Sequence, residues 1–184
     1  MTVTLILGGA RSGKSRYAQR LARRLSEQPV YVATSRRWDD DHAARIARHQ
    51  QDRGPEWQTI EAEKHLASLD LQGRIIVVDC VTLWLTNFFA DTRGDPEAAL
   101  RFTIEQFDRS VDPHRGNTWL FVSNELGQGV HASTQAGRQF VDAQGWLNQH
   151  IAARADHVVL MVAGLPLDVK GRAEGLVASL QEPA

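Results

Sequence analysis

The chain has 184 residues, which predicts a single domain, residues 1–184, with a substantial hydrophobic core. Its 21 basic and 22 acidic residues nearly cancel, so the charge gives no general reason to expect nucleic acid or an anionic membrane as a partner. The single cysteine (Cys80), the lack of a recognisable signal sequence and the lack of any stretch of roughly 20 apolar residues predict a cytoplasmic protein without an internal disulfide or a membrane span.

The first half of the chain alternates apolar runs with helical patterns. The predicted elements are, in order, a buried strand at 3–7, a helix at 16–25, a strand at 29–34, a polar basic helix at 39–52, a short strand at 57–60 and a weaker helix at 63–71.

The second half continues this alternation. It is predicted to hold a strand at 74–80, an apolar segment of ambiguous type at 81–93, a helix at 95–110, a strand at 118–123, a helix at 133–155 interrupted or strained at Gly137 and Gly145, and a last strand at 157–163. The segment GLPLDVKG at 164–171 receives no assignment. Strands that alternate with helices predict an α/β protein, with a mostly parallel sheet covered by helices on both faces.

A phosphate-binding signature follows the first strand. The pattern G-x-x-x-x-G-K-[ST] is matched throughout by Gly8, Gly9, Ala10, Arg11, Ser12, Gly13, Lys14 and Ser15. Glycines let the backbone curl so that its N–H groups point at phosphate oxygens, and the helix that follows adds its positive end. Lys14 is expected to reach the β- and γ-phosphates of a nucleotide, and the Ser15 hydroxyl to bind Mg²⁺.

Asp79 is the expected partner of this loop. It ends the apolar run IIVVD and so emerges at the carboxyl edge of the sheet, where sites in α/β proteins assemble. Its carboxylate could hold Mg²⁺ with Ser15, or it could simply cap the next turn. The loop and Asp79 leave a kinase, a hydrolase and a nucleotide-sensing switch open.

Further stretches carry a resemblance to one family. The segments GGARSGKSRYA, YVATS, DDHAARIARHQQDRGPEWQTIE, VSNELGQG and GWLNQHIAARADHVVLMVAGLPLDVK resemble, in order and spacing, the bifunctional adenosylcobinamide kinase / adenosylcobinamide-phosphate guanylyltransferase of cobalamin biosynthesis. The resemblance implies phosphorylation of adenosylcobinamide with ATP or GTP. It also implies transfer of GMP from GTP to the resulting phosphate through a guanylyl-histidine, which gives adenosylcobinamide-GDP. It further implies a P-loop NTPase-like core and a homo-oligomer, a trimer.

The resemblance assigns His49 as the guanylylated histidine. A neutral imidazole is a competent nucleophile, and the neighbouring arginines Arg45, Arg48 and Arg53 could counter the charge on the α-phosphate. The nucleotide contacts that it implies beyond the loop are Ala33, Thr34, Ser35, Gln50, Gln51, Asp52, Arg53, Glu61 and Asp79. The Glu61 carboxylate could accept hydrogen bonds from guanine.

The segment VSNELGQG follows another apolar strand, so Asn124 and Glu125 are candidate contacts for the corrinoid or the nucleotide. The chain departs from the family pattern at His131, where proline is usual, and at Gln50, where arginine is common. Two other interpretations remain: a monofunctional P-loop kinase of a small metabolite, and a non-catalytic nucleotide-binding switch. The near-neutral charge argues against an ATPase that handles nucleic acid.

Overall fold

The computed structural model describes residues 1–36 and 54–172, which form one seven-stranded sheet with the order β3-β2-β4-β5-β1-β6-β7. The strands are β1 (Thr2–Gly8), β2 (Val30–Ala33), β3 (Gln58–Glu61), β4 (Ile75–Asp79), β5 (Thr118–Val122), β6 (His157–Val162) and β7 (Leu165–Lys170). Every neighbouring pair is parallel except β6 and β7, which are antiparallel.

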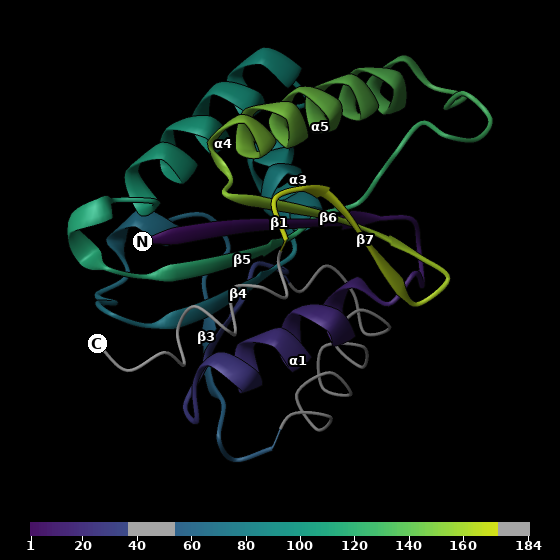
Figure 1. Cartoon of the computed structure of the whole chain (residues 1–184). Helices are drawn as coiled ribbons and strands as arrows, with labels where there is room; N and C mark the ends of the chain where they lie inside the picture. Colours follow the sequence, from purple (N-terminus) through teal and green to yellow (C-terminus); the bar gives the residue numbers. More distant parts are fainter. Residues whose placement is uncertain (37–53, 173–184) are drawn as a thin grey trace.

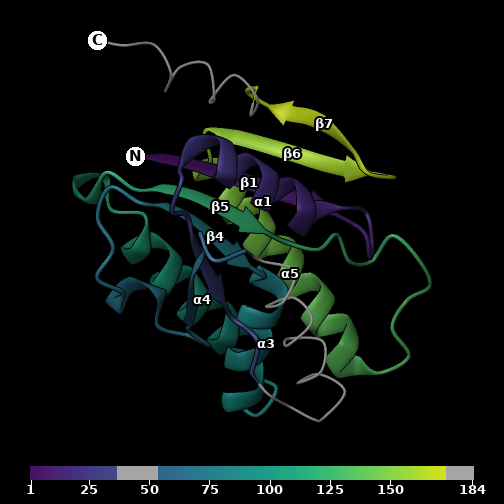
Figure 2. The same cartoon turned by 90° about the horizontal axis from the view of Figure 1, so that it is seen from below.

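Helices cover both faces of this sheet, as predicted (Figures 1 and 2). The helix α1 (Lys14–Leu25) lies on one face, and α3 (Val81–Asp91), α4 (Pro96–Ser110) and α5 (Gln135–Arg154) lie on the other. Two short 3-10 helices, η1 (Leu66–Ser68) and η2 (Pro113–Arg115), complete the described elements. The predicted helix at 39–52 lies outside the described residues.

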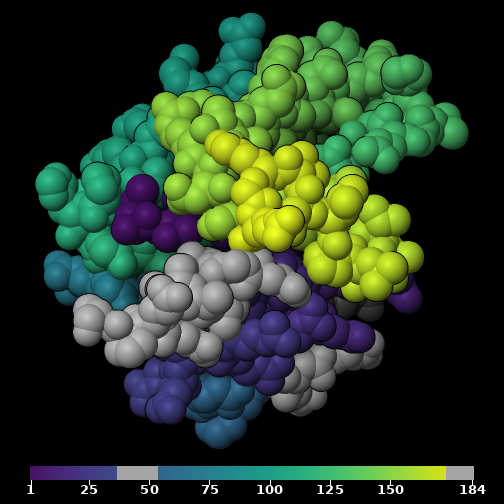
Figure 3. All heavy atoms as spheres, viewed as in Figure 1, coloured from purple at the N-terminus to yellow at the C-terminus, as the bar shows by residue number. Residues whose placement is uncertain are grey.

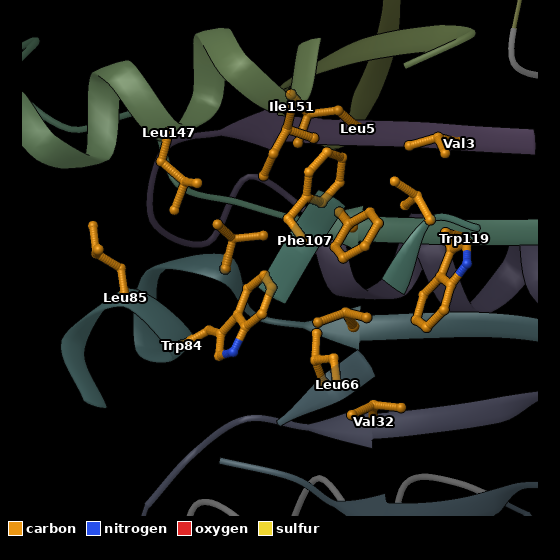
Figure 4. Packing of buried hydrophobic residues seen from close by; sticks show 14 of the residues in the cluster. Val3, Leu5, Val32, Leu66, Trp84, Leu85, Phe107, Trp119, Leu147 and Ile151 are labelled. Carbon is orange, nitrogen blue, oxygen red and sulfur yellow. The ribbon is translucent and has the colours of Figure 1, made fainter. Parts of the chain in front are cut away.

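The hydrophobic core is divided by the sheet, because alternate side chains of a strand point to opposite faces. On the α3–α5 face, Leu5 packs with Phe107, Leu147 and Ile151 in the larger cluster (Figure 4). On the other face, Ile6 packs with Tyr17 and Leu21 of α1. Burial on both faces explains why the central strands read as nearly continuous apolar runs.

Two expectations are corrected by the structure. The weaker helix at 63–71 reduces to the single turn η1, because Asn87 donates to the Glu63 carbonyl at 2.8 Å and Trp84 to the Lys64 carbonyl at 2.8 Å. These bonds to α3 hold the start of the segment in a non-helical path. The long helix α5 runs without interruption through Gly137 and Gly145.

The segment after β6, which received no assignment from the sequence, forms the strand β7. Ala163 and Gly164, with φ of 51° and 85°, make a two-residue turn between Val162 and Leu165. This is a hairpin turn of the kind that requires positive φ at both central residues, and alanine at the first of them conceals it in the sequence. The ambiguous segment at 81–93 is the helix α3.

Candidate active site

The phosphate loop is the turn between β1 and α1. It needs glycine at Gly8 and Gly13, whose φ values are 149° and 97°, and a Cβ added at Gly8 would lie 2.6 Å from the Met161 carbonyl oxygen. The Ser12 amide donates to the Gly9 carbonyl at 3.3 Å, which closes the turn. The loop thus delivers the chain to the N-terminus of α1, where backbone N–H groups have no partner within the helix and can bind an anion.

Lys14 lies inside this loop. Its side chain is buried, and Nζ donates to the Gly9 carbonyl at 2.6 Å. Burial lowers the pKa of Lys14 below its ordinary value, and the charge of the nearby Asp79 carboxylate opposes this shift. The loop therefore holds a partly desolvated cation. A bound phosphate group could replace the Gly9 carbonyl as the hydrogen-bond acceptor of the Lys14 ammonium.

Asp79 ends β4 at the carboxyl edge of the sheet. Tyr31 of β2 donates its hydroxyl to Asp79 Oδ2 at 2.9 Å and so orients the carboxylate. No group of three or more His, Cys, Asp and Glu side chains able to hold a metal occurs in the part of the chain that the structure describes. If Ser15 and Asp79 hold a Mg²⁺ ion, nucleotide phosphates and water would supply its other ligands, as is usual for an ion that takes few ligands from the protein.

The ends of β2 and β3 meet β4 at the same edge. Ala33 lies in register between Glu61 and Asp79. Thr34 is fully buried, and its hydroxyl donates to the Cys80 carbonyl at 2.8 Å. Thr34 is thus engaged in joining β2 to β4, whereas Glu61 is exposed at the end of β3 and Ser35 is half-buried beside them.

His49, Gln50, Gln51, Asp52 and Arg53 lie outside the described residues. The residue that precedes the undescribed segment is firmly held: Arg36 donates to Glu63 at 2.8 Å and to Asp91 of α3 at 3.0 Å. Lys64 also pairs with Asp91. Hydrogen bonds from Arg36 and Lys64 hold the pKa of Asp91 well below its usual range.

Sequence reasoning missed the part of the site that β6 and β7 supply. The Gly164 amide, in the turn between these strands, donates to the Ser12 carbonyl at 3.0 Å. A Cβ added at Gly13 would lie 3.4 Å from Gly164 Cα, so the turn packs closely against the phosphate loop. The contact joins residues about 150 positions apart, and the only local signal was the glycine that ends the run HVVLMVA.

The loop after β5 contacts the phosphate loop from the other side. The Glu125 amide donates to the Gly8 carbonyl at 3.1 Å. Asn124 is held by Thr82, whose hydroxyl accepts from Asn124 Nδ2 at 3.0 Å. Glu125 is therefore next to the phosphate loop through its backbone, and Asn124 lies against the start of α3.

A sequence model of the family described as cobinamide kinase / cobinamide phosphate guanyltransferase matches residues 4–169. The chain belongs to this family. The sequence predicted kinase and guanylyltransferase activities in cobalamin biosynthesis for this chain. The family assignment confirms this prediction.

Two curated relatives agree with this assignment. The chain is 42% identical to the bifunctional adenosylcobalamin biosynthesis protein CobP of Pseudomonas aeruginosa, over 91% of this chain and 96% of that protein. It is 36% identical to the bifunctional adenosylcobalamin biosynthesis protein CobU of Escherichia coli K12, over 90% and 98%.

The fold is also similar to that of a solved ATPase from the type III secretion system of pathogenic bacteria. The TM-score is 0.55 at 10% identity, over 96% of this chain and 61% of that one. At this identity the likeness concerns the fold, which is α/β as predicted. None of the helices within residues 1–36 and 54–172 is long and apolar enough to cross a membrane.

Proposed function

We propose that one nucleotide site, built on the loop from Gly8 to Ser15, serves both reactions of this chain. The observation that carries the proposal is the buried Lys14 ammonium inside the loop, on the same sheet edge as Asp79. Residues Gly8–Ser15, Ala33, Thr34, Ser35, Glu61 and Asp79 would surround the nucleotide, with Thr34 acting through the strand end that it fixes.

In the kinase reaction, the loop amides and Lys14 hold the β- and γ-phosphates of ATP or GTP for attack by the aminopropanol hydroxyl of adenosylcobinamide. Phosphoryl transfer depends mainly on such positioning and charge stabilisation. Bound at Ser15 and Asp79, Mg²⁺ would neutralise charge on the phosphates. The hydrogen bond from the Tyr31 hydroxyl would fix the orientation of the Asp79 carboxylate during this step.

In the transfer reaction, His49 attacks the α-phosphorus of GTP, so that a P–N bond forms and pyrophosphate leaves. An oxygen of adenosylcobinamide phosphate then attacks the same phosphorus, the P–N bond breaks, and adenosylcobinamide-GDP leaves with the free histidine regenerated. The family match over residues 4–169, a range that includes His49, and the bifunctional names of the relatives support this route. Gln50, Gln51, Asp52 and Arg53 would contact the nucleotide beside it.

Labelling with α-³²P-GTP tests the covalent step. We expect acid-labile, alkali-stable label from the α-position, none from γ-³²P-GTP, and none on a His49→Ala protein that still phosphorylates adenosylcobinamide. If GTP binds and no α-label forms, the monofunctional kinase replaces the two-step route. If the protein binds nucleotide but transfers neither the phosphoryl group nor GMP, the non-catalytic switch becomes the better interpretation.

We further propose that residues 1–184 are one domain that works as a homo-oligomer, a trimer by resemblance, in the cytoplasm, where its nucleotide substrates are made. The edge strand β7 supports association: Leu165, Leu167 and Val169 are 70%, 57% and 61% exposed. Figure 3 shows this strand at the surface. A large exposed apolar patch is typical of a protein interface.

A further inference from the structure

A cavity of about 260 Å³ lies beside the phosphate loop, on the face of the sheet that α5 covers. Its walls are Leu7, which precedes the loop, Glu125 and Leu126 after β5, and Gly145, Asn148, Gln149 and Ala152 of α5. The Glu125 amide bonds to the Gly8 carbonyl at 3.1 Å, so the cavity is joined directly to the first glycine of the loop. Lys14, on the Gly9 carbonyl, marks the β/γ-phosphate end of the loop.

Gly145 is the feature that the packing of the protein does not explain. It lies in the middle of the 20-residue helix α5, where glycine costs more conformational entropy than alanine. A Cβ added there would meet nothing within 4 Å, and its φ is not in the left-handed region. Neither a close contact nor the backbone requires a glycine, but a side chain at this position would take up space in the cavity.

The polar wall of the cavity is fixed in advance. The Asn148 amide oxygen accepts from Ser123 at 2.6 Å and from Gln144 at 3.0 Å, and its Nδ2 donates to the Asn124 carbonyl at 3.1 Å. Asn148 and Gln144 are both more than nine-tenths buried. An apolar cavity with a few well-placed polar groups is typical of a small-molecule site.

We propose that this cavity is a subsite for the corrinoid substrate and receives one of the primary-amide side chains on the edge of its ring. The proposal rests on the proposed function. Glu125 and Gln149 offer oxygens to an amide NH₂ group, and Gln149 also offers a donor to its carbonyl, while Leu7 and Leu126 face its methylene groups.

The chemistry of the walls argues against other parts of the substrates. The Glu125 carboxylate would repel a phosphate, so the cavity does not suit the nucleotide phosphates. The volume lies below the roughly 300–1,000 Å³ of a site for a drug-sized ligand, so it suits one side chain of the corrinoid and not the whole macrocycle. The anchored amide arm would hold the ring near the loop while its aminopropanol hydroxyl reaches the γ-phosphate.

The first test narrows the cavity without disturbing the fold. We expect Gly145→Leu to raise KM for adenosylcobinamide about tenfold or more in the kinase assay, and Gly145→Ala to raise it less, with GTP binding unchanged. The control Ala153→Leu adds the same side chain on the exposed face of α5 and should leave both constants unchanged. An unchanged KM for adenosylcobinamide in folded Gly145→Leu protein overturns the subsite. A changed oligomeric mass of this variant also overturns it, because it would show that a second copy of the chain fills the cavity.

The second test concerns the amide itself. An adenosylcobinamide derivative with one side-chain amide hydrolysed to a carboxylate should bind the wild type more weakly than the parent, because Glu125 repels it. Glu125→Gln should reduce this discrimination, and an equal discrimination for every isomer in both proteins overturns the role of Glu125. If the wild type does not turn over adenosylcobinamide, the proposed function fails. The subsite is then judged by comparing corrinoid binding, followed by visible absorbance, in wild type and Gly145→Leu.

Discussion

Lys14 folds back onto its own loop, and this has a consequence for how the free protein binds nucleotide. Its ammonium is buried on the Gly9 carbonyl, and burial lowers its pKa below the ordinary 10.5. Nucleotide phosphates favour the charged form, so they raise this pKa when they bind. Binding therefore takes up a proton at pH values between the two pKa values.

From this we expect the affinity for ATP or GTP to fall with rising pH, by at most about tenfold per pH unit, from a pH below 10.5 upward. Calorimetric titration over a pH series measures the fall. In a Lys14→Arg protein the side chain stays charged over the whole pH series, while any titration of the nucleotide itself affects both proteins equally. The affinity of this variant should therefore depend less on pH. Equal slopes in the two proteins would remove Lys14 as the titrating group.

Cys80 follows Asp79 in the chain, but its thiol group is expected to be unreactive in the folded protein. Burial and the Asp79 charge raise the pKa of its thiol to about 12, and only 8% of the residue is exposed. Since the thiolate is the reactive form, we expect no reaction with a thiol reagent at pH 8 in the folded protein and full reaction in denaturant. Rapid labelling of the native protein would contradict the buried position.

At the scale of elements, α5 carries two glycines with opposite surroundings. A Cβ at Gly145 meets nothing within 4 Å, whereas one at Gly137 would lie 2.9 Å from the Ala132 Cβ. Gly137 also donates its amide to the cap residue Thr134 at 3.0 Å, so it belongs to the first turn of the helix. The two sites therefore respond differently to the same substitution.

We expect Gly145→Ala to raise the free energy of unfolding by about 0.5–1 kcal/mol, which corresponds to roughly 1–4 °C in Tm for a chain of this size. Gly137→Ala should give no gain, because the added methyl group must displace Ala132 or the cap. Thermal unfolding followed by circular dichroism distinguishes the two. An equal gain in the free energy of unfolding for both variants would mean that helix propensity alone determines the effect.

Elements with strong local signals could be predicted from the sequence. The helix α4 begins where predicted because Asp95 caps it, accepting from the Glu97 and Ala98 amides at 3.0 and 3.1 Å, with Pro96 in its first turn. The segment at 63–71 could not be predicted, since bonds from Trp84 and Asn87 determine its path. The same limit applies to the site: the glycine pattern reveals the loop, but it does not reveal Tyr31 of β2, which bonds to Asp79, or Gly164 in the turn after β6, which bonds to Ser12.

At the scale of the whole molecule, the edge strand β7 carries exposed apolar side chains. Leu165 and Leu167 are two residues apart on the strand, so they lie on one face, and Val169 follows at the register shift opposite Val158 and Val159; all three are more than half exposed. An edge strand of this kind also presents unpaired backbone groups to a neighbour. Both features favour contact with another copy of the chain.

We therefore expect Leu167→Glu to lower the mass measured by sedimentation toward that of one chain while the circular dichroism spectrum stays that of the wild type. Val130→Glu is the matched control, because Val130 is 99% exposed and lies in the loop after β5. A Leu167→Glu protein with the wild-type mass would place the interface elsewhere.

The bond from Gly164 to Ser12 sets the order in which this enzyme becomes able to hold its substrate. The ribosome makes the phosphate loop about 150 residues before the turn that packs against it, and the strands β2 to β6 are synthesised in between. A nascent chain thus carries an unfinished nucleotide site until its last strands dock. Cellular GTP or ATP then stabilises the chain once its site is complete, because a ligand stabilises the state that binds it.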